Sequence, residues 1–548
     1  MKFQPKTVGV AGGGILCFSV LFGYWGFDKV LNFGIKDQTA LRKRNEIYGI
    51  YLALPFAMDF RVYFFNVSNP NEVMKGAKPI LKEVGPYRYD LWKQKREVVD
   101  TNIDDSLTYT QYDIYYFNKE KSGDLSDEDY VTILNPLLIG MVNTVIRDSP
   151  ALLNVVNKAI PAIFQNTSTM YVTVKVKDIL FDGIKVYCNS KDFSSKAVCT
   201  QLKGQIPGIK KVPNEKGVYL FSLLGPRNAT NQKRFKVHKG IKNSKDLGKL
   251  MELDGQKELT IWGTPYCNRF KGTDGWIFPP GLSKEEGIWS FSGDLCRSIK
   301  AYYVDNVDYK GLDIRRYHAD LGDMSRIEED KCYCPKVCLK KGLFDLTKCM
   351  GVPIYGSLPH FLYTEDIYRQ QVQGLDPRIN DHIILIFFEP ITGTPVEARK
   401  RLQFNLPVNA VGKISLLKNI PKAMHPIFWV EEGMQLEGKL FTKLTMVFAL
   451  IKFMGGFKYF GMAAGTAVGG TGAFLYMRNR NLNDSSSDQK VSNKSENVLN
   501  ESVVDNNIDE IDYNNKKNIE MSRYLGTPIK DNSSYVKHIM SGHEFDKY

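Results

Sequence analysis

The chain has 548 residues, of which 43% are apolar and 24% are charged, and its formal net charge is +13. These values are ordinary for a folded protein with a sizeable core, and they exclude a fully disordered chain and a disulfide-rich miniprotein. A positive balance is typical of nucleic-acid binders, but its location along the chain decides whether that interpretation holds.

The first apolar segment covers residues 7–27, TVGVAGGGILCFSVLFGYWGF, and contains no charged residue. About 20 apolar residues span a bilayer as a helix. A cleaved signal peptide is the alternative, but the run is longer than the apolar part of such a peptide and no A-x-A-like site follows it. Tyr24, Trp25 and Phe27 at its far end are typical of a membrane interface. We predict an uncleaved signal anchor behind a cytoplasmic N-terminus, residues 1–6.

A second uncharged segment covers residues 459–477, YFGMAAGTAVGGTGAFLYM. Its glycines recur every four residues, at Gly461, Gly465 and Gly469. They therefore share one helix face, where small residues allow close helix contact in lipid. Gly9 and Gly13 have the same spacing in the first segment. A homo-oligomer held by these glycine faces is one interpretation, and glycines that a membrane helix merely tolerates are the other.

Two spans place both termini on one side of a membrane and residues 28–458 on the other. Basic residues follow as well as precede the first span, so they do not decide the orientation. Glycosylation sequons begin at Asn66, Asn166 and Asn228 in the middle segment, although similar triplets also occur in the tail. We predict a plasma-membrane protein with an extracellular domain over residues 28–458 and both termini in the cytoplasm.

The positive charge lies in residues 28–458, which carry +13, whereas residues 478–548 carry −2. We therefore expect no nucleic-acid partner. A mixed, solvated surface and a surface that attracts anionic lipids or acidic partners both stay open. Residues 478–548 are rich in Asn, Ser and Asp and poor in aromatic residues, which predicts a disordered cytoplasmic tail.

Eight of the nine cysteines lie between residues 188 and 349, and residues 332–338 read CYCPKVC. Closely spaced thiolates suit zinc, whereas disulfides need an oxidising compartment. An even number of cysteines in an extracellular segment favours four disulfides over a metal. Cys188 and Cys199 are a natural local pair, and the pairing of the other six stays open on these grounds. Cys17, inside the first span, is interpreted as a small apolar residue.

Much of the middle segment has the pattern of a large, mainly antiparallel sheet or barrel. Runs rich in β-branched and aromatic residues cover residues 60–68, 169–181 and 382–390. Each run is bounded by Pro, Gly or Asn, as strands are.

Residues 131–164 differ, because their apolar residues follow a helical spacing. Ser149 and Pro150 predict a helix start, and Pro161 predicts a kink in that helix. Its apolar stripe consists of Leu152, Leu153, Val156, Ile160, Ile163 and Phe164. A core face and an exposed surface for hydrophobic ligands are both open interpretations. Lys158 is the cation of this helix.

The sequence contains none of the short motifs of common enzyme classes, such as HExxH, G-x-S-x-G or a Walker loop. Its seven histidines form no ligand-spaced cluster. His360 lies between a proline and aromatic residues, which is typical of a packed, hydrogen-bonded histidine. We predict no catalytic residues, no metal and no cofactor.

Several long segments are distinctive: NPNEVMKGAKPILKEVGPYRYDLW, SGDLCRSI, YGSLPHFLY, EPITGTPVEARKRLQFNL and HPIFWVEEG. Through them the chain resembles the class B scavenger receptor family, from residue 7 to residue 480. Within that family it most resembles the insect sensory neuron membrane proteins. The segments LPFAMDFRVYFFNVSNPNEV, KDILFDGIKVYCNSKDFSSKAVC and KCMGVPI are similar to the second of their two main subtypes.

The resemblance implies an α+β extracellular domain, an irregular antiparallel β-barrel with a helical bundle at the end far from the membrane. It also implies a hydrophobic tunnel toward the bilayer and two transmembrane helices as anchors. The disulfides implied by position are Cys267–Cys332, Cys296–Cys349 and Cys334–Cys338, which leaves Cys188–Cys199. A lysine of lipid-binding relatives aligns with Lys158, so we expect ligand contacts at Lys158, Leu152, Val156 and Ile160.

The function implied by the resemblance is that of a receptor or carrier. It would bind hydrophobic odorants, pheromones or fatty acids and pass them to the membrane in insect olfaction, for detection or for lipid clearance. Odorant receptors or odorant-binding proteins are the expected protein partners. A scavenger or adhesion receptor for lipoproteins, cell surfaces or a protein partner is the second hypothesis, and a lipid hydrolase is the third.

Overall fold

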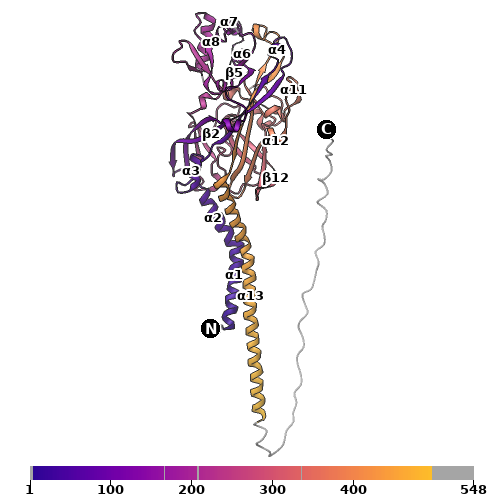
Figure 1. The fold of residues 1–548 in the computed structure, drawn as a ribbon. Helices are drawn as coiled ribbons and strands as arrows, with labels where there is room; N and C mark the ends of the chain where they lie inside the picture. The colour runs from indigo at the N-terminus through magenta and orange to yellow at the C-terminus, as the bar shows by residue number, and fades with distance from the viewer. Residues whose placement is uncertain (1–3, 166, 206–208, 335, 497–548) are drawn as a thin grey trace, which may run out of the picture. The chain divides into compact units, whose positions relative to one another are not determined.

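The structure is a computed structural model that describes residues 4–165, 167–205, 209–334 and 336–496. It divides into two units, one that ends at Gly472 and one that begins at Ala473. The first unit contains the large domain and most of two long terminal helices (Figure 1). The last helix, α13 (Gly438–Glu496), extends into the second unit. It includes residues 478–496, the first part of the tail for which disorder was predicted.

A 13-stranded antiparallel sheet forms the centre of the domain as described. Along its main path the strands are β10 (Leu250–Leu253), β9 (Thr230–His238), β3 (Ser106–Phe117), β2 (Leu81–Thr101), β1 (Met58–Val67), β18 (Ala423–Gln435), β17 (Thr394–Val408), β16 (Ile384–Glu389), β13 (Leu312–Ala319), β12 (Arg297–Tyr309) and β11 (Ile288–Ser292). On a branch, β15 (Tyr355–Ser357) pairs with β17 and with β14 (Leu343–Asp345).

The alternation of side chains along β1 explains why this segment is a strand. Phe60, Val62 and Phe64 are buried on one side of the sheet, in the main apolar core. Asp59 and Arg61 alternate with them and are only half-buried on the other side. Successive side chains of a strand point to opposite faces, so this pattern is compatible with one buried face and one polar face.

The segment Gly272–Asp274 closes the sheet into a barrel. The backbone N–H of Leu250, in β10, donates to the carbonyl oxygen of Gly272 at 3.0 Å. The N–H of Phe291, in β11, donates to the carbonyl of Thr273 at 2.8 Å. Since β10 and β11 are the two ends of the sheet, this segment bridges edges whose polar groups would otherwise lack partners. The predicted antiparallel barrel is confirmed.

The predicted strand over residues 169–181 is correct only in its first part. β5 (Tyr171–Lys175) pairs with β4 (Tyr130–Leu134) in a separate two-stranded sheet. The chain then forms a π-helix over Asp178–Asp182, in which the neighbours Ile179 and Leu180 are both buried. The helical turn carries both side chains into the main apolar core.

Three helices gather at one end of the first unit: α6 (Pro136–Asp148), α7 (Leu153–Ile163) and α8 (Phe193–Gln205) (Figure 1). A short 3-10 helix, Pro150–Leu152, precedes α7, and the Ser149 side chain makes no capping hydrogen bond there. α7 packs against α6 and α8, and α6 packs against β17. A three-stranded sheet of β6 (Ile184–Tyr187), β8 (Val218–Phe221) and β7 (Ile209–Lys211) connects to α8.

Short helices occupy the connections elsewhere. They are α3 (Glu46–Leu52), α4 (Pro70–Val73), α5 (Lys119–Ser122), α9 (Pro265–Asn268), α10 (Thr347–Met350), α11 (Asp366–Arg369) and α12 (Ile379–His382).

The main apolar cluster joins Leu138 and Val142 of α6 to Val62 and Phe64 of β1. The helical bundle and the barrel therefore share one core.

Each end of the chain forms a helix long and apolar enough to span a membrane, Pro5–Thr39 and Gly438–Asn483. The first consists of α1 (Pro5–Leu21), a π-turn and α2 (Phe27–Thr39) without a break. The predicted spans, residues 7–27 and 459–477, lie inside these longer helices. Where the predicted spans begin and end therefore stays a prediction.

The two terminal helices pack against each other through glycines. A Cβ atom on Gly12 would overlap the backbone of Gly469, and one on Gly465 would lie 2.6 Å from the backbone nitrogen of Leu16. A Cβ atom on Gly13 would meet nothing within 4 Å, so a larger side chain at this position would not separate the helices. The glycine face proposed for a homo-oligomer is thus occupied by the chain's own first span. A partner in the same chain is favoured because its effective concentration is high.

We expect Gly12→Val to separate the two helices, since the added side chain would meet backbone that cannot move aside. Overpacking of this kind costs about 1–3 kcal/mol. The thermal midpoint of the full chain in detergent should fall by several degrees. Gly14→Val is the matched control, because a Cβ there meets nothing within 4 Å. Equal midpoints for the two variants would contradict the glycine contact.

Candidate ligand-binding site

The bundle of α6, α7 and α8 is fixed to the barrel by the first turn of α6 and by buried side chains of that helix. α6 begins at Asn135, whose side-chain oxygen accepts a hydrogen bond from the N–H of Leu138 at 3.1 Å. Pro136 occupies the first helical position, where its missing N–H costs nothing. Leu138 and Val142 are then buried against the barrel core. The bundle is therefore a fixed part of the domain and a rigid base for any surface that it carries.

The four side chains predicted to contact a ligand do not share one surface. Val156 and Ile160 of α7 are 2% and 4% exposed and belong to the main core. Lys158 is exposed. Two residues along a helix correspond to a rotation of about 200°, which puts Lys158 on the opposite face from Val156. Leu152 is 50% exposed at the start of the helix.

Lys158 has an acidic neighbour, Asp192, directly before α8. The pKa of the Asp192 carboxyl is lowered, first by the N–H of Ser195 and to a smaller extent by the Lys158 ammonium. Asp192 accepts that hydrogen bond at 2.8 Å, at the start of α8. Lys158 therefore lies near a carboxylate where α7 meets α8.

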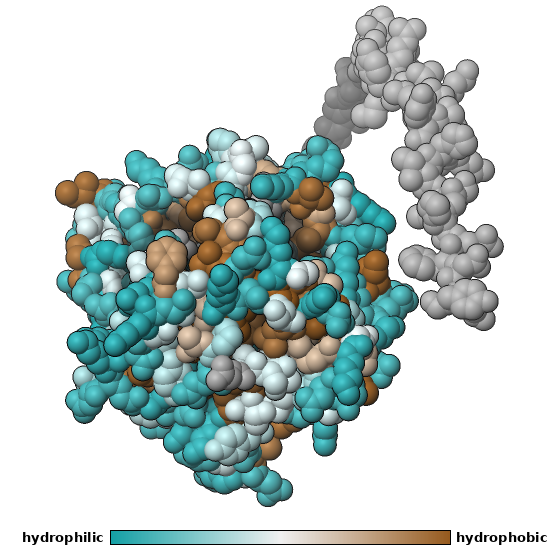
Figure 2. All heavy atoms as spheres, turned by 90° about the horizontal axis from the view of Figure 1, so that it is seen from above, coloured by the Kyte–Doolittle hydropathy of each residue, from teal (hydrophilic) through white to brown (hydrophobic). Residues whose placement is uncertain are grey.

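Apolar side chains that the sequence pattern did not single out are exposed on these helices. Phe193, the first residue of α8, is 79% exposed, and Ile146 of α6 is 38% exposed. Figure 2 looks onto this end and shows apolar surface gathered toward the middle, within a rim of hydrophilic side chains. The sequence KDFSSK could have indicated that Phe193 is exposed. Its aspartate caps the start of a helix, and Phe193 follows in the first turn.

Four disulfides are present among the described residues: the three pairs that the resemblance implied and the local pair that they left over. They are Cys188–Cys199, Cys267–Cys332, Cys296–Cys349 and Cys334–Cys338. The first joins β6 to α8 and so ties the bundle to its neighbouring sheet. No group of three His, Cys, Asp or Glu residues that could hold a metal occurs in the described part of the chain.

Three cysteines of CYCPKVC, Cys332, Cys334 and Cys338, form disulfides that pack against a cluster of aromatic rings. Trp262 lies edge-on to Tyr333 and to Phe344, with ring centroids 5.3 Å and 5.6 Å apart. The indole N–H of Trp262 donates to the carbonyl of Cys296 at 2.7 Å. The cysteines of this segment therefore stabilise a small separate core beside the barrel.

Two of the predicted glycosylation residues are half-buried, Asn66 in β1 and Asn228 just before β9. The side-chain oxygen of Asn66 accepts from the N–H of Thr132 at 2.7 Å. That of Asn228 accepts from the N–H of Tyr115 at 3.1 Å. Asn166 lies outside the described residues. Glycosylation of all three stays a prediction.

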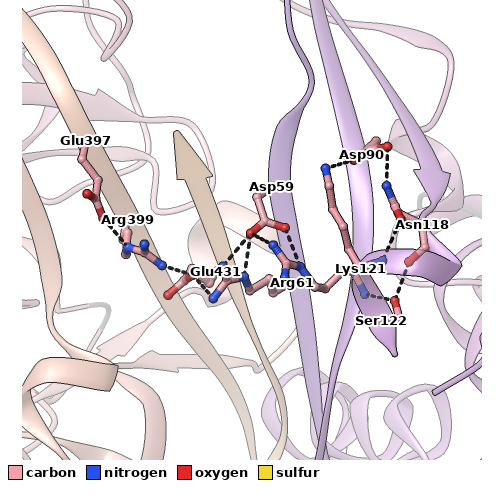
Figure 3. Close-up of polar contacts among 10 residues, drawn as sticks. Asp59, Arg61, Asp90, Asn118, Lys121, Ser122, Glu397, Arg399 and Glu431 are labelled. Atoms are coloured by element: carbon pink, nitrogen blue, oxygen red, sulfur yellow. Dashed lines mark hydrogen bonds and ion pairs between the residues drawn. The ribbon is translucent and has the colours of Figure 1, made fainter. Parts of the chain in front are cut away.

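A chain of ion pairs crosses the polar side of the barrel (Figure 3). Arg399 donates to Glu397 at 2.7 Å and to Glu431 at 3.1 Å. Glu431 also pairs with Arg61, at 3.1 Å, and Arg61 pairs with Asp59. Burial by itself would raise the pKa of Asp59, but hydrogen bonds from Arg88 and Arg61 lower it. These contacts connect β17, β18, β1 and β2 and serve the barrel wall.

His360 is packed and hydrogen-bonded, as the sequence pattern indicated. Its Nδ1 accepts from the N–H of Asp376 at 3.0 Å, so its Nε2 donates to the Glu83 carboxylate at 2.5 Å. Trp429 donates to the same carboxylate at 2.7 Å. The ring of His382 stacks on that of His360, with centroids 4.4 Å apart. Both histidines are buried.

Most of the chain is similar to a family of known proteins. The model of the CD36 family matches residues 10–476. The chain is 42% identical to "Sensory neuron membrane protein 1" of Apis mellifera over 483 residues, which is 88% of this chain and 92% of the relative. It is 42% identical to the protein of that name from Plutella xylostella, over 80% of this chain and 84% of the relative.

We expect the core and surface residues of α7 to respond differently to substitution. Ile160→Ala removes buried methyl groups and should cost about 2–4 kcal/mol, whereas Lys158→Glu should stay within about 0.5 kcal/mol. The measurement is the urea midpoint of the purified full chain. A loss of stability in Lys158→Glu equal to that in Ile160→Ala would contradict the assigned faces.

We expect acid to destabilise the domain. Burial lowers the pKa of His382 and of His425 to about 4 in the folded chain. The ordinary pKa is about 6.5, so the unfolded chain binds more protons between these values. Stability that is complete above pH 6.5 is therefore lost as the pH falls toward 4, by at most about 3 kcal/mol for each histidine.

The measurement is the thermal midpoint of the full chain between pH 7 and pH 5. The variant that combines His382→Asn with His425→Gln should show a shallower fall than the wild-type chain. Equal slopes would show that other groups cause the acid sensitivity.

Proposed function

Because this chain belongs to the CD36 family, we propose that it is a cell-surface receptor that binds hydrophobic odorants or fatty-acid-derived lipids and passes them to the membrane in insect olfaction. Family membership confirms the predicted resemblance to the class B scavenger receptors. The two relatives are both named as protein 1, so the resemblance to the second subtype stays a prediction. The chain is a plasma-membrane protein with two spans and both termini in the cytoplasm.

The apolar core shared by the bundle and the barrel is the observation that carries this proposal. One cluster joins Leu138 and Val156 of the bundle to Phe64 and Phe428 of the barrel strands. Each CH₂ group that moves from water to an apolar interior gains about 0.8 kcal/mol. Partition of this kind needs no covalent chemistry, so we propose a receptor or carrier and no enzyme. The hydrophobic tunnel stays a prediction within this proposal.

The start of α13 supports delivery to the bilayer. Phe441, Leu444 and Phe448 pack against Leu312 and Ile314 of β13. Helix α13, which contains the second predicted span, therefore begins on the barrel wall itself. A ligand that leaves the barrel at this end would meet an apolar helix that leads into the membrane.

The exposed apolar side chains of the bundle favour the second candidate function, a scavenger or adhesion receptor. Leu152 and Phe193 offer apolar contact area that a lipoprotein or a protein partner could cover. In this case ligands would bind at the bundle and would not pass into the bilayer.

The test uses the full chain, reconstituted in liposomes, and a fluorescent long-chain fatty acid bound to albumin. We expect the chain to accelerate transfer of the fatty acid into the bilayer several-fold over empty liposomes. Replacing both exposed apolar residues, Leu152→Ser with Phe193→Ser, should reduce the acceleration if ligands are taken up at the bundle. Ile103→Ser, at an 88% exposed position of the β2–β3 connection, is the matched control.

Binding of lipoprotein particles without any acceleration of fatty-acid transfer would overturn the carrier proposal. It would support the scavenger or adhesion receptor instead.

A further inference from the structure

Three apolar and aromatic side chains lie together on the outer face of β2 and β3. Trp92 of β2 pairs with Ile114 of β3, and Tyr116 follows two residues later on the same face. Tyr116 is 58% exposed and Trp92 is 38% exposed. Single exposed side chains of this kind are ordinary, whereas a contiguous group marks an interaction surface. We call these three residues the outer aromatic patch.

One end of this row is already covered by the chain itself. Tyr112 precedes Ile114 by two residues and faces the same way. The guanidinium carbon of Arg96 lies 3.2 Å from the centroid of the Tyr112 ring, which is a cation–π contact. The surface that is still open to solvent is therefore that of the outer aromatic patch.

Polar side chains border the patch beside Tyr116. Asp90 lies directly opposite Tyr116 in the strand pair. Its carboxylate accepts hydrogen bonds from Lys121 at 2.7 Å and from Asn118 at 2.8 Å (Figure 3). A molecule on the patch would meet ring faces in the centre and hydrogen-bonding groups at this border. Carbohydrate fits both, because a sugar ring has C–H groups on its faces and hydroxyl groups around its edge.

A glycosylation sequon, residues 228–230, lies at the edge of β3. The side-chain oxygen of Asn228 accepts a hydrogen bond from the backbone N–H of Tyr115 at 3.1 Å. Tyr115 stands between Ile114 and Tyr116 in the strand. The amide group of Asn228 is therefore held within one residue of two members of the patch.

The inner side of the sheet offers no room for a glycan at this level. The ring of Tyr115 fills it, with ring centroids 5.1 Å from Phe60 and 5.4 Å from Phe181. These rings belong to the main apolar core or pack against it. A glycan on Asn228 therefore has to leave the sheet on the outer side, where the patch lies.

The spacing of the strands also suits a glycan. Neighbouring strands lie about 4.8 Å apart, which is close to the width of one sugar ring. β3 lies between the sequon and β2, so Trp92 is one strand spacing further from Asn228 than Ile114 is. The first two sugars of an N-linked glycan are therefore long enough to cover both strands.

We propose that Asn228 carries an N-linked glycan whose first sugars lie on the outer aromatic patch. The proposal rests on the predicted glycosylation of Asn228 and does not depend on the carrier function. The C–H faces of the sugars contact the rings of Tyr116 and Trp92, and their hydroxyl groups form hydrogen bonds at the border with Asp90. The glycan thus replaces water over exposed apolar surface and makes this surface unavailable to other proteins.

The test is hydroxyl-radical footprinting of the full chain, purified in detergent from insect cells. Mass spectrometry of its peptides gives the glycan occupancy at Asn228 and the oxidation of each aromatic side chain. Thr230→Ala removes the sequon and keeps the Asn228 side chain. We expect oxidation of Tyr116 and Trp92 to rise several-fold in this variant, because both rings lose their cover.

Two controls separate uncovering of the patch from loosening of the fold. Thr230→Ser keeps the sequon and the hydroxyl group, which donates to the carbonyl of Pro226 at 2.6 Å, so the patch should stay protected. Tyr302 of β12 is 59% exposed on a distant strand of the sheet. Its oxidation should therefore be the same in all three chains.

Three outcomes would overturn the proposal. Absence of a glycan from Asn228 in the wild-type chain would leave the patch open to a protein partner. Full occupancy, with equal oxidation of Tyr116 and Trp92 in the wild-type chain and in Thr230→Ala, would show a glycan that points away from the patch. A rise at Tyr302 as large as that at Tyr116 would show a general loosening of the fold.

Discussion

The pairing of β1 with β18 is the contact on which the rest of the structure depends. Phe60 lies opposite Glu432 and Phe64 lies opposite Phe428, so a strand near the start of the chain is joined to one near its end. α13 begins directly beyond β18, whereas residues 40–57, which include α3, lead from α2 to β1. Both helices leave the domain at the same end, and their glycines meet. The topology with two termini on one side of the membrane follows from this single strand pair.

Barrel closure adds a second constraint, which acts on the interior. The segment Gly272–Asp274 joins the outer strands, and it carries Asp274 into contact with two tyrosines that come from α3 and β3.

The bundle shows how one helix can serve both core and surface. Val156 and Ile160 secure α7 to the barrel, and this fixed position determines where Lys158 points. The disulfide Cys188–Cys199 adds a covalent tie on the other side of the bundle. Recognition at this end would therefore take place on a rigid surface.

Much of this structure could be predicted from residues that act locally. The apolar runs, the helix start near Ser149 and the alternation of residues 60–68 express preferences of neighbouring residues. The long segments shared with a known family added the barrel and the disulfide pairs. The predicted strand over residues 169–181 was wrong in its second half, where the chain forms a helical turn over Asp178–Asp182.

The tertiary structure alone decided which surfaces meet. The glycines of the second span could equally have served two copies, and only the β1–β18 pair shows that they face the first span. The spacing of Lys158 and Val156 was visible in the sequence, but which of the two faces is buried was not. Trp92, Ile114 and Tyr116 gave no joint signal in the sequence, because the patch that they form depends on the register of β2 against β3. Contacts between residues far apart in the chain depend on strand register and closure, and no local preference encodes them.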